Sequence, residues 1–167
     1  ISAEKISADF DGLPINFSVV TVEDKGEPSY INIATSGKLS AKGLAAITSW
    51  DKLTEYAKGN SNFQSSVRIP VHSDNLTVEF NSSLKGIAID LPGAFGKSEQ
   101  QVKSLSLNAD FDPKTTSGQF AFDYQDTANA IVNFQHFSQS DYQLQIDARL
   151  PRLIWPMPSS HLNNKES

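Results

Sequence analysis

LTVEFNSSL, residues 76–84, alternates apolar and polar side chains almost without a break. Leu76, Val78, Phe80 and Leu84 fall on one side of an extended chain, whereas threonine, glutamate, asparagine and serine residues stand between them. A period of two indicates a β-strand with one apolar face and one polar face, because successive side chains point to opposite sides of a sheet. This stretch therefore predicts a strand that has to bury or cover one face only.

The same alternation recurs along most of the chain. It is present at residues 6–10, 15–19, 63–71, 87–91, 105–111, 120–124 and 142–150. Short turn signals such as Asp112-Pro113 and Ser117-Gly118 separate these segments, which favours antiparallel hairpins. The sequence predicts a mainly β fold in which an antiparallel curved sheet is either an open groove or a sandwich-like closed structure. Alternation alone does not distinguish the two, because both need one apolar face per strand.

One segment has a different period. Leu44, Ile47, Trp50, Leu53 and Ala57 follow a spacing of three and four residues, which predicts one α-helix around residues 44–58. The chain has 167 residues, the size of one domain. We expect residues 1–157 to form a single β-rich domain, or an internal segment of a longer β-groove protein, and residues 158–167 to form a flexible tail.

Composition argues against several functional classes. The 14 basic and 19 acidic residues are scattered, with no basic stripe for a nucleic-acid backbone. There is no cysteine, and His72, His136 and His161 have no partner at metal-ligand spacing. The sequence ADFD occurs at residues 8–11 and 109–112, where we expect the carboxylates to form turns. We therefore predict no catalysis, no cofactor, no metal site and no nucleic-acid partner.

GAFGKS, residues 93–98, ends like a phosphate-binding loop. The first glycine of that motif would fall at position 91, which is leucine, and too few apolar residues follow for the required helix. We expect a structural turn instead, in which Gly93 and Gly96 adopt positive φ and Lys97 behaves as a surface residue.

Read as a whole, SSLKGIAIDLPGAFGKS, residues 82–98, resembles a recurring signature of the YhdP branch of the AsmA-like bacterial proteins. The positions that follow the signature are Ser83, Leu84, Gly86, Ile87, Leu91, Pro92, Phe95, Gly96 and Lys97. The family usually has a second proline where this chain has Ala94. The resemblance extends over about residues 36–125.

The resemblance implies a long periplasmic bridge, anchored in the inner membrane by a helix outside this sequence. Its β-rich body would form a hydrophobic groove for phospholipid passage toward the outer membrane. This chain would be one non-catalytic segment, and its open edges would pair with neighbouring segments of the parent chain.

On this hypothesis the apolar strand faces contact acyl chains. The residues expected to do so are Leu76, Val78, Phe80, Ile87, Ile89, Leu105, Leu107, Phe120 and Phe122. The alternative is a closed β-sandwich binding or adhesion module, in which the same side chains form an ordinary core.

Overall fold

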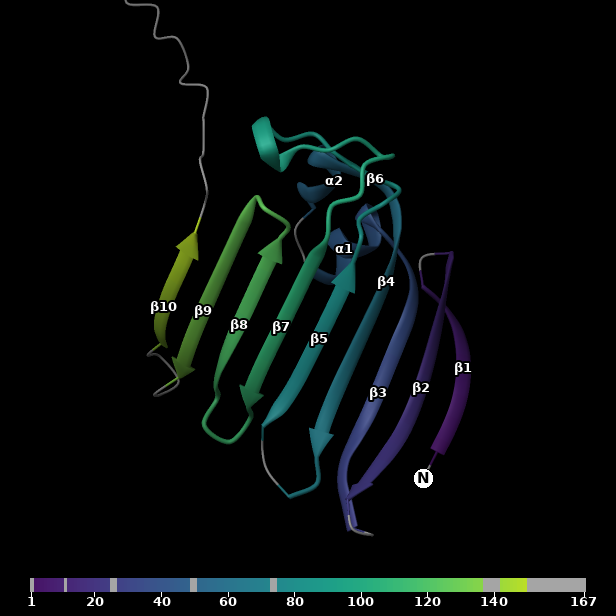
Figure 1. Cartoon of the computed structure of the whole chain (residues 1–167), viewed down its shortest axis with the longest axis vertical. Coiled ribbons are helices and arrows are strands. Elements are labelled where there is room, and N and C mark those ends of the chain that lie inside the picture. The colour runs from purple at the N-terminus through teal and green to yellow at the C-terminus, as the bar shows by residue number, and fades with distance from the viewer. Residues whose placement is uncertain are drawn as a thin grey trace, which may run out of the picture.

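The fold is an open antiparallel sheet with two short α-helices at one end (Figure 1). The computed structural model describes residues 2–10, 12–24, 27–48, 51–72, 75–136 and 142–149. The main strands are, in spatial order, β1 (Ser2–Phe10), β2 (Leu13–Asp24), β3 (Glu27–Ser40), β4 (Ala57–Pro70), β5 (Leu76–Ser82), β7 (Leu105–Asp112), β8 (Ser117–Tyr124), β9 (Ala128–His136) and β10 (Tyr142–Arg149). The mainly β, antiparallel fold predicted from the sequence is confirmed.

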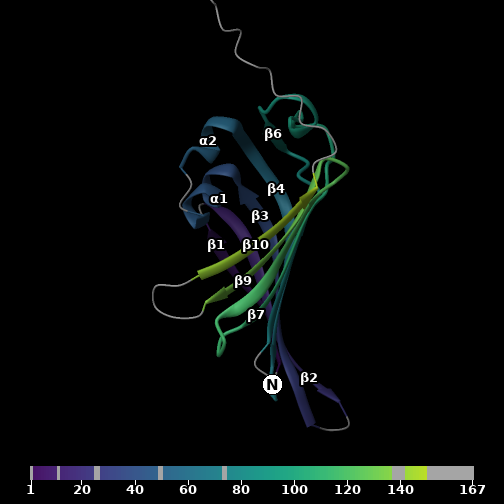
Figure 2. The same ribbon diagram turned by 90° about the vertical axis from the view of Figure 1, so that its left-hand side faces the viewer.

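Each main strand pairs with the next main strand along the chain, so the sheet is a continuous meander with β1 and β10 at its edges. A short strand, β6 (Ile87–Ile89), lies off this path and pairs with the start of β4. Figure 2 shows the sheet twisted and curved, with both helices on the same side of it. Strands β3 and β9 were missed in the sequence. Alanine, threonine and glycine dilute the apolar alternation in β3, and two alanines and the adjacent pair Ile131 and Val132 break it in β9.

The register places one uncharged side chain from every main strand in a single row across the sheet. Each residue in this row is directly opposite the next in the pairing of neighbouring strands. The row consists of Ile6, Phe17, Thr35, Ser65, Phe80, Leu107, Phe122, Ala130 and Ala148. We call the side of the sheet that carries this row the apolar face.

The adjacent row of opposite residues is displaced by one residue in each strand. Its side chains point to the other side of the sheet and are polar. That row consists of Ser7, Asn16, Ser36, Gln64, Asn81, Ser106, Asp123 and Asn129. We call this side the polar face. The two rows show that the period of two seen in single strands is kept in phase through the whole sheet.

No second sheet covers the apolar face in the described part of the chain. Among the described residues, no large side chain falls below 2% relative exposure. A closed sandwich would bury many large side chains almost completely, because two inner faces interdigitate. Of the two architectures left open by the sequence, the structure has the open sheet.

The helical region agrees with the sequence in place but differs in extent. Helix α1 (Ala41–Thr48) begins earlier than expected, because the Ser40 hydroxyl accepts the Gly43 N–H at 2.8 Å and caps it. Helix α2 spans only Leu53–Tyr56, and β4 already begins at Ala57. The prediction of one helix over residues 44–58 is thus wrong in its bounds. Pairing of Ala57 with Ile89 draws the last predicted turn into the sheet.

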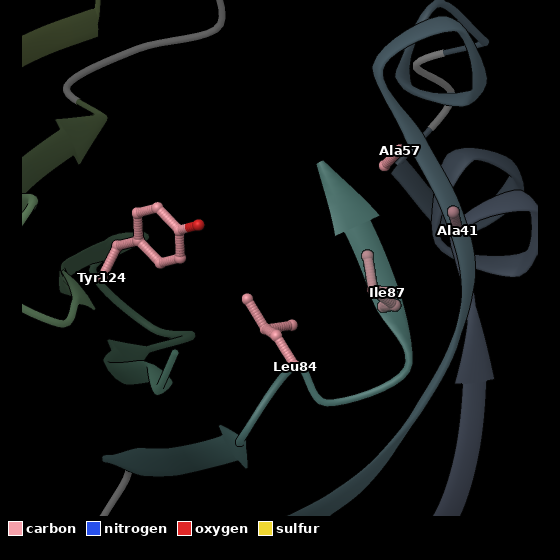
Figure 3. Close-up of a cluster of buried hydrophobic side chains, with 5 residues drawn as sticks. All are labelled: Ala41, Ala57, Leu84, Ile87 and Tyr124. Atoms are coloured by element: carbon pink, nitrogen blue, oxygen red, sulfur yellow. The ribbon is translucent and has the colours of Figure 1, made fainter. Parts of the chain in front are cut away.

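A small hydrophobic core lies at the end of the sheet where the helices are. It contains Ala41, Ala57, Leu84, Ile87 and Tyr124, which come from the start of α1, the start of β4, the loop after β5, β6 and the end of β8 (Figure 3). Residues 83–104, which connect β5 to β7, wrap around this core, and we call them, together with α1 and α2, the cap. Most of the buried hydrophobic residues in the described part of the chain belong to this core.

The YhdP-like signature, residues 82–98, provides much of this cap. The Tyr124 hydroxyl donates to the Phe95 carbonyl at 3.1 Å, and the Lys103 ammonium lies 4.4 Å from the centre of the Tyr124 ring. Gly93 has the predicted positive φ of 62°. The predicted positive φ at Gly96 is wrong, because its φ is −76°. A Cβ at this position would lie 2.3 Å from the Leu91 carbonyl oxygen, so glycine is needed here for space rather than for conformational freedom.

Lys97 is not a surface residue, and that expectation was wrong. Its side chain is only 6% exposed and donates to the carbonyl oxygens of Leu84 at 2.8 Å, Ser98 at 2.9 Å and Ile87. Burial lowers the pKa of the ammonium. The group that would contact a phosphate in a nucleotide-binding loop is instead turned inward, where it holds three segments of the cap together.

We predict that Lys97→Ala destabilises the protein by about 1–3 kcal/mol, because buried carbonyl groups lose their donor. The measurement is urea unfolding followed by circular dichroism. The control is Lys85→Ala, at an exposed position of the same loop, which should change the free energy of unfolding by less than about 0.5 kcal/mol. Equal midpoints for the two variants would show that the Lys97 contacts contribute nothing.

Candidate functional site

The apolar face contains seven of the nine residues expected to contact lipid. They are Leu76, Val78, Phe80, Leu105, Leu107, Phe120 and Phe122, on β5, β7 and β8. The register brings them together, for example through the opposite positions of Phe80 and Leu107 and of Leu107 and Phe122. All seven are half-buried. They pack against their neighbours but remain accessible from the open side of the sheet.

Ile87 and Ile89 are placed differently from the expectation. The sequence suggested that they continue the alternation of β5, but the chain reverses at Leu84 and Gly86, which have φ of 49° and 96°. Strand β6 consequently pairs with β4. Ile87 is buried in the cap core, where it also borders the apolar face, and Ile89 packs against that core.

A hollow of about 410 Å³ lies on the apolar face next to the cap. Its lining contains no charged side chain and comes from seven main strands, β1 to β5, β7 and β8, together with β6, the loop after β5 and helix α1. Residues that the sequence did not assign to the site are Phe10, Ile15, Leu39, Leu44 and Phe63. Alternation around Phe10, Ile15 and Phe63 was visible in the sequence, but only the meander brings their side chains to the same face as those of β5. Leu44 was assigned to a helix, and the sequence did not indicate which part of the sheet that helix overlies.

Aromatic rings are paired on this face. Phe63 and Phe80, on neighbouring strands, stack with ring centres 5.6 Å apart and an interplanar angle of 17°. Phe111 and Phe134 stack at 6.1 Å although β8 lies between their strands. Gly118 of β8 is opposite both residues and leaves the space for them to meet, because a Cβ there would lie 2.7 Å from the Phe134 ring.

The polar face has a different chemistry. Arg68 and Glu79 form an ion pair at 3.7 Å, with both side chains more than two-fifths exposed, and Gln119 donates to Asn133 at 2.9 Å. A larger hollow of about 780 Å³ on this face is lined mostly by polar side chains that include Lys38, Gln64 and Asn81. Such groups are well solvated in water, so volume alone does not identify a site here. The lining chemistry favours the smaller hollow.

Asp112, the last residue of the second ADFD segment, starts a turn, as predicted. Asp112 accepts the backbone N–H groups of Lys114 at 2.9 Å and Thr115 at 3.3 Å. Hydrogen bonds from Thr115 and Lys114 lower the pKa of the Asp112 carboxyl. Asp9 accepts the Gly12 N–H at 2.8 Å, and Asp11 lies outside the described residues. Within the described ranges no group of three or more histidine, aspartate or glutamate side chains gathers in metal-binding geometry.

Residues 150–167, which include the predicted tail at 158–167 and His161, lie outside the described residues. In the part of the chain that is described, no helix combines the length and the apolarity needed to cross a membrane.

Comparison with protein families matches residues 1–156 to the family described as YhdP protein. The match covers nearly the whole chain, including both edges of the sheet, the apolar face and the cap. No curated protein and no solved structure matches the chain.

We predict that Gly118→Ala destabilises the protein by about 1–3 kcal/mol, because the added methyl group overpacks the strand. The new Cβ would lie 2.4 Å from the Asp110 carbonyl oxygen and would displace the Phe134 ring. Thermal and urea unfolding measure the effect. Asn108→Ala, at an exposed position on the polar face, is the control and should unfold like the wild type. An unchanged midpoint for Gly118→Ala would mean that the two rings do not need this space.

Proposed function

The chain belongs to the YhdP family, and on that premise we propose that it is a segment of a phospholipid-conducting groove in the bacterial periplasm. The segment binds acyl chains on the apolar face and catalyses no reaction. The parent protein would be anchored in the inner membrane by a helix outside this sequence, and the groove would lead toward the outer membrane.

The observation that carries this proposal is the continuity of the apolar face. An uncharged row crosses the main strands from β1 to β10 without interruption. The outer parts of the apolar face are well exposed, with Ile6 at 53%, Leu144 at 59% and Ile146 at 58%. Large continuous apolar patches are rare on soluble proteins and mark binding surfaces, since exposing them to water is unfavourable. Acyl chains are the ligands that such a face suits without any polar partner.

The arrangement of the ends supports a path that runs across the strands. The cap closes the apolar face at one end of the strands, whereas β1 and β10 are unpaired on their outer sides within the described sheet. Unpaired edge strands offer backbone N–H and C=O groups to a further strand. Neighbouring segments of the parent chain, pairing with β1 and β10, would prolong the same groove in both directions.

The alternative function, a closed β-sandwich adhesion module, would require a second sheet over the apolar face. The described residues contribute none, so a second sheet would have to come from outside them. The groove requires only the curved sheet and its ligand. A lipid-conducting groove is also the function expected of a YhdP family member. We therefore prefer lipid conduction.

We predict that Phe80→Glu folds but no longer retains phospholipid. Phe80 lies in the uncharged row and is only half-buried, so a carboxylate there reaches water when lipid is absent. In a closed core the same charge would cost several kcal/mol and unfold the domain. The measurements are thermal unfolding and native mass spectrometry of phospholipid that co-purifies with the protein.

Gln64→Glu is the matched control, since it adds the same charge on the polar face of neighbouring strand β4. It should retain both fold and lipid. A wild type that never carries lipid would refute the groove, and global unfolding of Phe80→Glu would favour a covered core.

A further inference from the structure

The hollow beside the cap is the part of the apolar face that has walls on more than one side. Two parts of the cap line it. Leu44 of helix α1 lies above the sheet, and Leu84 and Ile87 of residues 83–104 lie at the strand ends. Leu84 and Ile87 are 8% and 7% exposed and thus fixed by packing. At the β10 edge of the same face, by contrast, Leu144 and Ile146 are more than half exposed. The described apolar face therefore combines an enclosed part with an open part.

Two small side chains form the floor of this hollow and make it deeper than the surrounding face. Thr35 of β3 and Ser65 of β4 are directly opposite each other and both line the hollow. Ile33 and Val67 follow them along the same two strands as the next opposite pair on this face. Replacing that larger pair by two small hydroxyl residues leaves a depression, whose side is formed by the stacked rings of Phe63 and Phe80.

The polar groups at the closed end of the hollow are already paired with protein atoms. Ser82 donates to the Asn62 carbonyl at 2.8 Å, its hydroxyl oxygen accepts the Leu84 N–H at 3.1 Å, and it lies 3.2 Å from the Ser61 hydroxyl. A peptide needs a partner for each N–H and C=O group that it buries, and an unpaired one is costly. A hydrocarbon chain needs none. With an uncharged lining and about 410 Å³ of space, the hollow suits hydrocarbon rather than a peptide strand.

We propose that this hollow is a discrete binding site for the end of one lipid acyl chain, with its methyl end against Ile87 and its polar end directed away from the cap. This inference rests on the proposed function and deepens it. Lipid on the remaining apolar face is exchangeable along the sheet, whereas the chain in the hollow has a defined position, set by Thr35 and Ser65 below and Leu44 above. The segment thus provides a resting position within the groove rather than a uniform surface.

The test uses delipidated protein and oleate, a single-chain probe, counted by native mass spectrometry over a titration. Wild type should saturate with one tightly bound oleate. Ser65→Leu fills the depression and should weaken this binding at least about tenfold. Ser66→Leu is the matched control, because the same substitution at the next residue of β4 projects to the polar face. It should bind one oleate with wild-type affinity.

Thr35→Leu fills the same hollow from β3 and should weaken oleate binding in the same way. It replaces Ser65→Leu as the test variant if that variant does not fold. Several equivalent oleates on the wild type, or unchanged binding in a folded leucine variant, would overturn the single-chain site and leave the groove standing. If wild-type protein binds no oleate and also carries no phospholipid on purification, the proposed function itself fails.

Discussion

Strand register is the constraint on which this structure depends. Because successive side chains point to opposite faces, a slip of one residue between two strands would move all apolar side chains of one strand to the polar face. Between β3 and β4 the pairing runs without a shift from Tyr30–Pro70 to Ser40–Asn60. The irregularities that do occur lie between Ala3 and Ile6 in β1 and between Val22 and Glu23 in β2. They are near a sheet edge and near a strand end, so the middle of the apolar face stays in phase.

An open sheet of this kind has little core of its own, and the cap supplies a compact one. Leu84 and Ile87 come from the segment after β5 and Tyr124 from the end of β8, and they meet at one end of the sheet. The buried Lys97 ammonium joins the carbonyl groups of this region, where an unpaired polar group would be costly. A motif that looks like the end of a phosphate-binding loop therefore has a structural role, which follows from the direction of one side chain.

The same geometry relates stability to function. A second layer on the apolar face would stabilise the sheet by burying more apolar surface, but it would also remove the surface that a lipid could occupy. At the closed end the cap, including α1, covers part of the apolar face. The area toward β10 remains exposed. Hydrogen bonds on the polar face, such as that from Gln119 to Asn133, keep the other side compatible with water.

The sequence by itself determined the local structure of most strands and the chemistry of their faces. Alternation at residues 76–84 and 105–111 placed Val78, Phe80 and Leu107 correctly, because a period of two depends only on the backbone of each strand. The turn at Asp112 and the signature at residues 82–98 were equally local. What these patterns lacked was any information on which strands become neighbours.

Only the tertiary structure decided the rest. It separated Ile87 and Ile89 from β5 by pairing β6 with β4, shortened the helix because Ala57 pairs with Ile89, and buried Lys97. It also left the sheet open instead of folding it into a sandwich. These outcomes depend on contacts between residues far apart in the chain. Alternating strands satisfy an open sheet and a closed one equally well, and the choice between them is made only when the strands, the cap and the helices pack together.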